Sequence, residues 1–364
     1  MADVPDTAPI LFEVQGPLGV ITLNRPKALN ALNLAMIRQM GPQLAAWADD
    51  PVIAAVVIEG AGDRAFCAGG DVRAVYESGL AARQSGAALT GMPADFFREE
   101  YILNHQIHTF PKPYIAIVDG IAMGGGVGLS IHGTYRVVTD RLMLAMPETG
   151  IGLFPDVGGG WFLNRYPGAL GTYFGLTGAR GGAAEAIMTG YATHHVPSDR
   201  VADLQQALAA GDVSTPHSIG AILDRFHTDP DPSDLANHRD VIDRCFSADR
   251  VEDILTRLAA EPGRFAAETA AMLARHSPTS LKVTLAHLRR SVGLSYRDVV
   301  TLEYRLSQAC MAGHDFYEGI RAVLVDKDRT PRWQPSELAA VDDALVERHF
   351  AALGPRDLSP ADGE

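Results

Sequence analysis

Residues 117–160 constrain the fold of this chain more than any other stretch. The sequence there reads IVDGIAMGGGVGLSIHGTYRVVTDRLMLAMPETGIGLFPDVGGG, and four of the five residues at positions 124–128 are glycine. The apolar run before the glycines predicts a buried strand, and the small residues after them predict a short helix. Because each glycine in a helix interior costs about 1 kcal/mol relative to alanine, the run indicates a close approach to the backbone. The approaching group is either neighbouring backbone in a tight helix–strand contact or a ligand.

The spacing of these glycines excludes two phosphate-binding motifs. The run contains neither a G-x-G-x-x-G dinucleotide fingerprint nor the Gly-Lys-Ser/Thr of a P-loop. A second glycine loop, Ala65–Asp71, follows another apolar run and precedes a predicted helix. Free backbone N–H groups at the start of a helix can hold an anion or a developing oxyanion. The alternative interpretation of this loop is an ordinary strand-to-helix turn with Asp71 as the N-cap.

Two isolated carboxylates follow the glycine run. Glu148 and Asp156 both lie in apolar, Gly- and Pro-rich surroundings, where desolvation raises the pKa of a carboxyl group. Such a group can act as a general base or a nucleophile beside an oxyanion-binding N–H. Asp156 has a competing structural interpretation as a helix cap, because a helix is predicted to begin near Gly158. Glu148 precedes no predicted helix, so the catalytic interpretation is stronger for it.

Composition and charge exclude several classes of function. The net charge of −13 at pH 7 argues against non-specific nucleic-acid binding and against a polybasic membrane anchor. No uninterrupted apolar run approaches the ~20 residues that span a bilayer. The N-terminal sequence has neither a basic n-region nor an apolar h-region, so we expect a cytoplasmic protein. Three scattered cysteines indicate reduced thiols, and His105 and His108 lack an H-E-x-x-H context, so no metal is expected.

The order of the predicted elements gives an α/β fold followed by a helical region. Strands and helices alternate through the first half, which is typical of α/β proteins. The predicted strands are 10–14, 20–23, 52–59, 113–118, 135–139 and 142–145, and the helices between them include 34–47, capped by Asn33, and 96–110. Later helical patterns are 201–210, 218–226, 251–260, 264–275, 281–291, 296–310 and 315–325. We therefore expect a core at 8–200, a helical region at 201–353 and a flexible tail at 354–364.

Taken together, these segments resemble the crotonase (enoyl-CoA hydratase/isomerase) superfamily. The resemblance extends from about residue 8 to residue 353, and it rests on the segments 23–30, 65–71, 112–128, 147–160, 277–284 and 303–310. It implies a spiral of β-β-α turns with two near-perpendicular sheets, followed by a helical C-terminal region. It also implies acyl-CoA thioesters as substrates and no cofactor beyond the CoA of the substrate. A homo-oligomer is compatible with the resemblance.

The resemblance further implies roles for single residues. The thioester oxygen would lie between the N–H groups of Gly70 and Gly125, with Glu148 as the reactive acid and Asp156 as its partner. The residues that it implies along the rest of the substrate are Glu100 at the acyl end, and Ala68 and Lys27 along CoA.

Gly128 distinguishes two activities of this superfamily. By resemblance, hydratases use two glutamates, one at the position of Glu148 and one at the position of Gly128, which has no side chain. Loss of one acid/base group removes a rate enhancement of roughly 10²–10⁴, whereas Asp156 stands where the hydrolase pattern has its second acid. The resemblance therefore implies hydrolysis of an acyl-CoA thioester, with 3-hydroxyisobutyryl-CoA of valine degradation as the expected substrate. The alternatives are an enoyl-CoA hydratase or isomerase and a non-catalytic acyl-CoA-binding protein.

Overall fold

Two units, each built from three separate stretches of chain, are distinguished in the computed structural model, which describes residues 8–85 and 91–359. Unit 1 takes its described residues from Met1–Gly70, Gln106–Leu144 and Gly181–Pro232, and unit 2 takes them from Asp71–His105, Ala145–Arg180 and Ser233–Glu364. The units follow packing and not chain order. The predicted boundary near residue 200 therefore stays a prediction.

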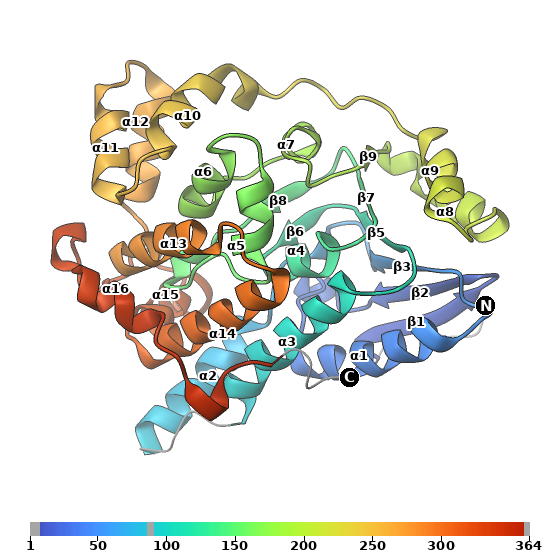
Figure 1. The fold of residues 1–364 in the computed structure, drawn as a ribbon, viewed down its shortest axis with the longest axis horizontal. Helices are drawn as coiled ribbons and strands as arrows, with labels where there is room; N and C mark the ends of the chain where they lie inside the picture. The colour runs from blue at the N-terminus through green and yellow to red at the C-terminus, as the bar shows by residue number, and fades with distance from the viewer. Residues whose placement is uncertain (1–7, 86–90, 360–364) are drawn as a thin grey trace. The chain divides into compact units, whose positions relative to one another are not determined.

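A six-stranded sheet is the main element of unit 1 (Figure 1). Its strand order is β1-β2-β3-β5-β7-β9; β1 and β2 are antiparallel, and the other neighbouring pairs are parallel. The strands are β1 (Ile10–Gln15), β2 (Leu18–Leu23), β3 (Ala55–Gly60), β5 (Tyr114–Val118), β7 (Tyr135–Val138) and β9 (His194–His195). Parallel neighbours need crossover connections, and α1 (Leu34–Asp49) is the connection from β2 to β3. The predicted α/β class is confirmed.

Buried strands and a helix cap explain the local structure of unit 1. Every residue of β5 is buried, as expected for the continuous apolar run of a parallel strand. The helix α1 begins where the sequence predicts, because the Asn33 side chain accepts a hydrogen bond of 2.9 Å from the Met36 N–H. One apolar cluster joins the sheet to the helices around Leu204. The later helices of this unit are α7 (Ala183–Thr189), which precedes β9, and α8 (Val201–Ala210) and α9 (Pro216–Asp224), which follow it.

A second sheet of three short strands carries the two glycine loops. Its strands, in the order β4-β6-β8, are β4 (Ala65–Cys67), β6 (Ile121–Met123) and β8 (Met143–Ala145). The helix α4 (Gly125–Ser130) follows β6 directly, and all of its residues are buried. The sequence predicts β8 but neither β4 nor β6. Glycines follow both of these short strands closely, and the residues of β4 fall within the predicted glycine loop Ala65–Asp71.

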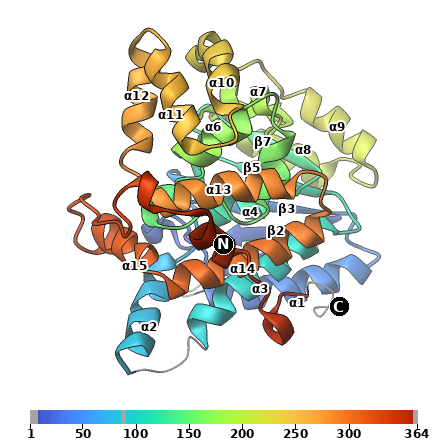
Figure 2. The same ribbon diagram turned by 60° about the vertical axis from the view of Figure 1, so that its left-hand side comes forward.

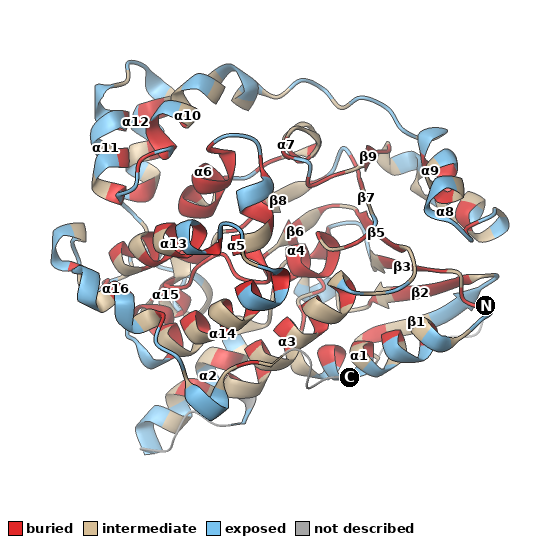
Figure 3. Ribbon diagram, in the orientation of Figure 1, coloured by how far each residue is buried: buried red, intermediate tan, exposed pale blue. Residues whose placement is uncertain are grey.

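Unit 2 consists mainly of helices. Among the described residues after 200, in both units, every element is a helix, so the predicted helical C-terminal region is confirmed. The short helix α5 packs against α13 and α14 (Figure 1), and α11 lies beside α12 (Figures 1 and 2). The outward faces of α10, α11 and α12 are exposed, whereas α13 and α14 are largely buried (Figure 3). The helices are α2 (Val72–Ser85), α3 (Met92–His108, with its last turn in unit 1), α5 (Gly159–Phe162), α6 (Leu170–Thr177), α10 (Arg239–Phe246), α11 (Val251–Ala260), α12 (Arg264–Leu273), α13 (Pro278–Ser291), α14 (Tyr296–Ala312), α15 (Asp315–Ile320) and α16 (Asp343–His349).

The first residues of the predicted C-terminal tail pack onto α14. The 3-10 helix η8 spans Gly354–Arg356, and Arg305 of α14 forms an ion pair of 2.8 Å with Asp357. The next residue, Leu358, is 3% exposed. Residues 360–364, where the predicted tail ends, lie outside the described residues. Among the helices that the structure describes, none is long and apolar enough to cross a membrane.

Candidate active site

Asp156 is the centre of a group of buried acids in unit 2. The Tyr101 hydroxyl donates a hydrogen bond of 2.7 Å to Asp156 Oδ2, and both residues are buried. Tyr101 lies on α3 next to Glu100, which is also buried. Glu148 is buried at the start of the 3-10 helix η2 (Glu148–Ile151). The charge of Asp156 acts on Glu100 and on Glu148, so the three predicted acids, hereafter the acid cluster, are brought together electrostatically.

Burial raises the pKa of every carboxyl group in the acid cluster, because an ionised carboxylate loses its hydration there. Burial takes the pKa of Asp156 to about 7; the Tyr101 hydrogen bond opposes this rise, and the charge of Glu303 adds to it. Burial, followed by repulsion from Asp156, holds the pKa values of Glu100 and Glu148 well above their usual range. Near neutral pH the acid cluster therefore holds protons as well as negative charge, and it can supply both a general acid and a general base.

Several buried polar atoms near the acid cluster have no hydrogen-bond partner within the described residues. They are Glu100 Oε1, Glu148 Oε2 and both polar side-chain atoms of Asn104. Asn104 is fully buried and lies one helical turn after Glu100, on the same face of α3. Because buried polar groups in proteins are nearly always paired, these atoms indicate a polar ligand or water. Asn104 is absent from the sequence-based candidates; its signal is a polar side chain at helical spacing from Glu100.

The loop that carries Asp156 is held by a residue that the sequence did not predict. Glu303 of α14 is fully buried and accepts hydrogen bonds from the N–H groups of Gly158 at 2.7 Å and Gly160 at 3.1 Å. Gly158 is the N-cap of α5 and has no side chain, so Glu303 supplies the acceptors for N–H groups at the start of this helix. The interpretation of Asp156 as a helix cap is therefore wrong, since its carboxylate bonds to Tyr101 instead. The sequence signal for Glu303 is a lone acid within the otherwise apolar buried stripe of α14.

The two glycine loops are neighbours in unit 1, because β4 and β6, the strands that they follow, pair in parallel. A Cβ atom on Gly126 would overlap the carbonyl group of Cys67, so tight backbone packing explains this member of the glycine run. Gly125 is the first residue of α4, where backbone N–H groups lack an acceptor within the helix. Gly70 ends the loop after β4 and pairs with Leu32 in an isolated bridge.

Ala68 and Lys27, the predicted CoA contacts, also belong to unit 1. The Ala68 N–H donates a hydrogen bond of 3.0 Å to the carbonyl oxygen of Leu29, which joins this loop to the turn after the 3-10 helix η1 (Pro26–Ala28). Lys27 is exposed on η1. Contact of these two residues with CoA stays a prediction.

The predicted site residues therefore divide between the two units. The acid cluster belongs to unit 2, whereas Gly70 and Gly125 belong to unit 1. Within residues 8–85 and 91–359, no group of three or more His, Cys, Asp or Glu side chains is arranged to hold a metal ion.

Comparison with known families matches residues 18–350 to the enoyl-CoA hydratase/isomerase family. The chain belongs to this family. The resemblance that the glycine loops and acids indicated is thereby confirmed over most of the sequence.

Curated relatives of this enoyl-CoA hydratase/isomerase family member carry the name of a thioester hydrolase. The "3-hydroxyisobutyryl-CoA hydrolase, mitochondrial" of Danio rerio is 50% identical over 96% of this chain and 91% of its own length. The protein of the same name from Homo sapiens is 48% identical over 96% of this chain and 90% of its own length.

Solved structures confirm the fold of this family for the whole chain. A carnitinyl-CoA dehydratase from Mycobacterium thermoresistibile is 44% identical, with a TM-score of 0.89 over 97% of this chain and 99% of its own. An enoyl-CoA hydratase from Rhodobacter sphaeroides is 40% identical, with a TM-score of 0.87 over 97% of this chain and 100% of its own.

The expectation of a cytoplasmic location is contradicted by the curated relatives, which are named as mitochondrial proteins. That expectation rested on the lack of a secretory n-region and h-region and of an apolar run long enough to span a bilayer. These features concern secretion and membrane insertion, so they do not distinguish the cytoplasm from the interior of the mitochondrion.

Proposed function

We propose that this family member hydrolyses 3-hydroxyisobutyryl-CoA to 3-hydroxyisobutyrate and CoA, a step of valine degradation. The observation that carries the proposal is the buried acid cluster of Glu100, Glu148 and Asp156. Burial and mutual repulsion give these carboxyl groups the mixed protonation that thioester hydrolysis requires. The names of the curated relatives support the same activity.

Glu148 is the reactive acid in this proposal. It either attacks the thioester carbonyl carbon itself, giving an anhydride that water then hydrolyses, or it removes a proton from the attacking water. In both routes the C–S bond breaks and a proton ends on the CoA sulfur. The oxygen of water ends in the new carboxylate when water attacks the acyl carbon, and in Glu148 when water attacks the Glu148 carbonyl of the anhydride. Its unpartnered Oε2 atom supports contact with a reactant. Asp156 orients Glu148, the water or the acyl hydroxyl.

The developing oxyanion is assigned to the backbone N–H groups of Gly70 and Gly125. One such donor typically contributes about 10²–10³ in rate. The position of Gly125 at the start of α4 supports this role. Ala68 and Lys27 are assigned to CoA binding on the basis of the resemblance alone.

Recognition of the acyl hydroxyl is assigned to Glu100 and Asn104. A hydroxyl group donates one hydrogen bond and accepts others, and the unpaired carboxyl oxygen and carboxamide on this face of α3 complement it. A site whose buried polar groups are satisfied by a substrate hydroxyl discriminates strongly against the analogue that lacks it.

A hydratase or dehydratase is the second candidate function, because the two solved structures described above carry such names. Gly128 counts against it, since the second glutamate of the hydratase pattern has no counterpart at that position. This candidate predicts hydration of crotonyl-CoA without release of free thiol.

The test is an assay of thiol release from a panel of acyl-CoA esters that includes 3-hydroxyisobutyryl-CoA, isobutyryl-CoA and crotonyl-CoA. We expect rapid release from the hydroxy ester, and a loss of about 10²–10⁴ in kcat for Glu148→Gln. Full activity in Glu148→Gln would exclude the mechanism. Hydration of crotonyl-CoA without thiol release would favour the second candidate, and tight binding with no turnover would indicate a non-catalytic acyl-CoA-binding protein.

A further inference from the structure

Glu303 uses both of its carboxylate oxygens within unit 2. Oε2 accepts the Gly158 N–H at 2.7 Å, and Oε1 accepts the Gly160 N–H at 3.1 Å. Oε1 also lies 3.1 Å from His287 Nε2, and because a carboxylate only accepts, His287 is the donor. Both side chains are fully buried. Glu303 therefore bridges α14, α13 and the loop that carries Asp156.

The loop that Glu303 holds has an unfavourable backbone. Val157 adopts φ of +52°, and Gly158 adopts φ of +90°. A β-branched residue rarely adopts the left-handed region, and such a conformation persists only when its surroundings enforce it. The contacts to Glu303 begin one residue after Val157. These contacts stabilise the conformation of Val157, because they fix the N–H groups of Gly158 and Gly160, which follow it in the loop.

The fit of the loop against α13 is equally close. A Cβ atom on Gly160 would lie 2.6 Å from His287 Cε1 and would also overlap Ser291 Oγ. Only glycine allows the loop to approach His287 this closely. The carboxylate of Glu303 and the ring of His287 thus determine where the backbone at Asp156 can lie.

We infer that Glu303 is a positioning residue for Asp156, holding the Asp156 loop through its two carboxylate oxygens. The inference rests on the proposed hydrolase function for its kinetic consequences. It does not assign Glu303 any contact with substrate.

The negative charge of Glu303 has a second effect on the acid cluster. Repulsion from this charge contributes to the raised pKa of Asp156, after the larger contribution of burial. Removal of the charge should lower that pKa. The other titratable groups that interact with Asp156 are Tyr101 and Glu100 of α3, Glu148 of η2, and Tyr296 and Cys310 of α14. His287 of α13 contacts Glu303.

The first test is Glu303→Gln, which keeps the size of the side chain, removes its charge and places an amide donor against a backbone N–H. We expect kcat to fall by about 10–100-fold, since small misplacements of catalytic groups have effects of this size. KM should stay within about threefold, because Glu303 contacts no substrate. The pH inflection of kcat/KM that belongs to Asp156 should move to lower pH. Glu303→Asp retains the charge, so it should keep the wild-type inflection while losing part of the activity.

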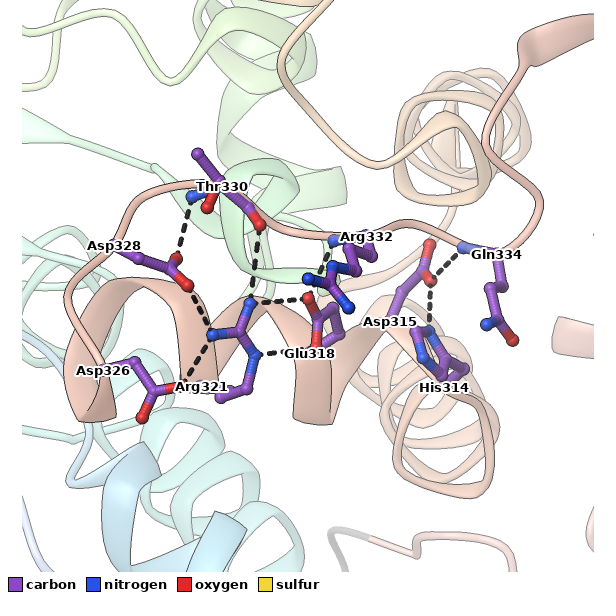
Figure 4. Close-up of polar contacts among 9 residues, drawn as sticks. All are labelled: His314, Asp315, Glu318, Arg321, Asp326, Asp328, Thr330, Arg332 and Gln334. Atoms are coloured by element: carbon purple, nitrogen blue, oxygen red, sulfur yellow. Dashed lines mark hydrogen bonds and ion pairs between the residues drawn. The ribbon is translucent and has the colours of Figure 1, made fainter.

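A matched control is Glu318→Gln on α15. Glu318 also secures a loop, since it accepts the Arg332 N–H at 2.8 Å and pairs with Arg321, but its partners lie outside the acid cluster (Figure 4). We expect Glu318→Gln to lower the melting temperature about as much as Glu303→Gln does. It should keep the wild-type pH inflection of kcat/KM. The control thus separates a general loss of structure from an effect on Asp156.

An activity-independent readout completes the test. The carboxyl carbon of Asp156 can be titrated by NMR in ¹³C-labelled protein, with the signal assigned by its loss in Asp156→Asn. A lower pKa in Glu303→Gln supports the inference even if the wild-type protein releases no CoA, an outcome that would refute only the proposed function. An unchanged Asp156 pKa together with an activity loss no larger than that of Glu318→Gln would overturn the inference.

Discussion

At the scale of single residues, Asp156 shows how a local pattern and a distant residue act on one carboxyl group. The apolar, glycine-rich sequence around Asp156 indicates burial, and burial is the main cause of its raised pKa. The two partners that adjust this pKa, Tyr101 and Glu303, are 55 and 147 residues away along the chain. The packing of α3 and α14 brings them close enough to act on Asp156. Tyr101 stabilises the ionised form through its hydrogen bond, and Glu303 destabilises it through its charge.

Replacement of Asp156 by asparagine should stabilise the protein while impairing catalysis. The folded pKa of Asp156 is raised from 3.8 to about 7, so its contribution to stability is full below the unfolded pKa and is lost as the pH rises through about 7. Asparagine stays neutral and can still accept the Tyr101 hydrogen bond. The melting temperature of Asp156→Asn should exceed that of wild type by roughly 2–4 °C at pH 8, and the difference should shrink toward pH 4. Calorimetry across this range measures the melting-temperature difference between Asp156→Asn and wild type. A smaller difference at pH 8 than at pH 4 would contradict the prediction.

Replacement of Asn104 by leucine should weaken selection of the acyl hydroxyl. Leucine has a similar volume but no hydrogen-bonding atoms, so the buried amide that remains unpaired in the structure is removed. The ratio of kcat/KM for 3-hydroxyisobutyryl-CoA over isobutyryl-CoA should fall by about 10–100-fold, equivalent to one lost hydrogen bond to a buried group. The rate on isobutyryl-CoA serves as the internal control. If both esters slow equally, Asn104 supports the fold and does not read the hydroxyl.

At the scale of elements, burial decides which helices and strands the sequence reveals. The helix α11 is amphipathic and was predicted with its observed bounds, Val251–Ala260. The helix α6 (Leu170–Thr177) was missed because all of its residues are buried, and a helix without a polar face has no visible period. The strands β4 and β6 are not predicted, because β4 lies within the segment predicted as a glycine loop and β6 ends directly before the glycine run.

Replacement of Gly126 by alanine should destabilise unit 1. The new Cβ atom would meet backbone and lie 2.9 Å from Cys67 Cβ, so α4 and β4 would have to separate. We expect a loss of about 1–3 kcal/mol in the free energy of unfolding, as for other overpacked cores. The control is Gly41→Ala in α1, where the nearest atom is the end of the Gln106 side chain at 3.5 Å. That variant should change the free energy of unfolding by less than about 1 kcal/mol, because the higher helix propensity of alanine is opposed by the contact of its Cβ with Pro42. Equal effects of both substitutions in urea unfolding would contradict the packing argument.

At the scale of the whole molecule, the two units divide the proposed reaction. Unit 1 supplies the glycine loops proposed for the oxyanion, and unit 2 supplies the acid cluster. Because each unit consists of three stretches that alternate along the chain, neither set of groups belongs to one continuous segment. The assembly of the chain into oligomers stays a prediction.

The proposed reaction also predicts independence from metals. Water, a carboxylate and hydrogen-bond donors suffice for thioester hydrolysis, so prolonged dialysis against EDTA should leave the rate of thiol release within about twofold of the untreated protein. Restoration of a lost rate by added Zn²⁺ or Mg²⁺ would show that this expectation is wrong.

The sequence by itself determined the α/β class, the helical second half, the two glycine loops and the candidates Glu148 and Asp156, because these depend on local composition and periodicity, whereas Glu100 came from the family resemblance. Tertiary structure alone decided the burial of Asn104 without a hydrogen-bond partner, the contacts of Glu303, the strained backbone at Val157 and the overlap that makes Gly126 a glycine. Each of these depends on which residues far apart in the chain become neighbours. A single sequence carries no direct signal of that, since long-range packing and the electrostatic coupling it creates arise only when the chain folds.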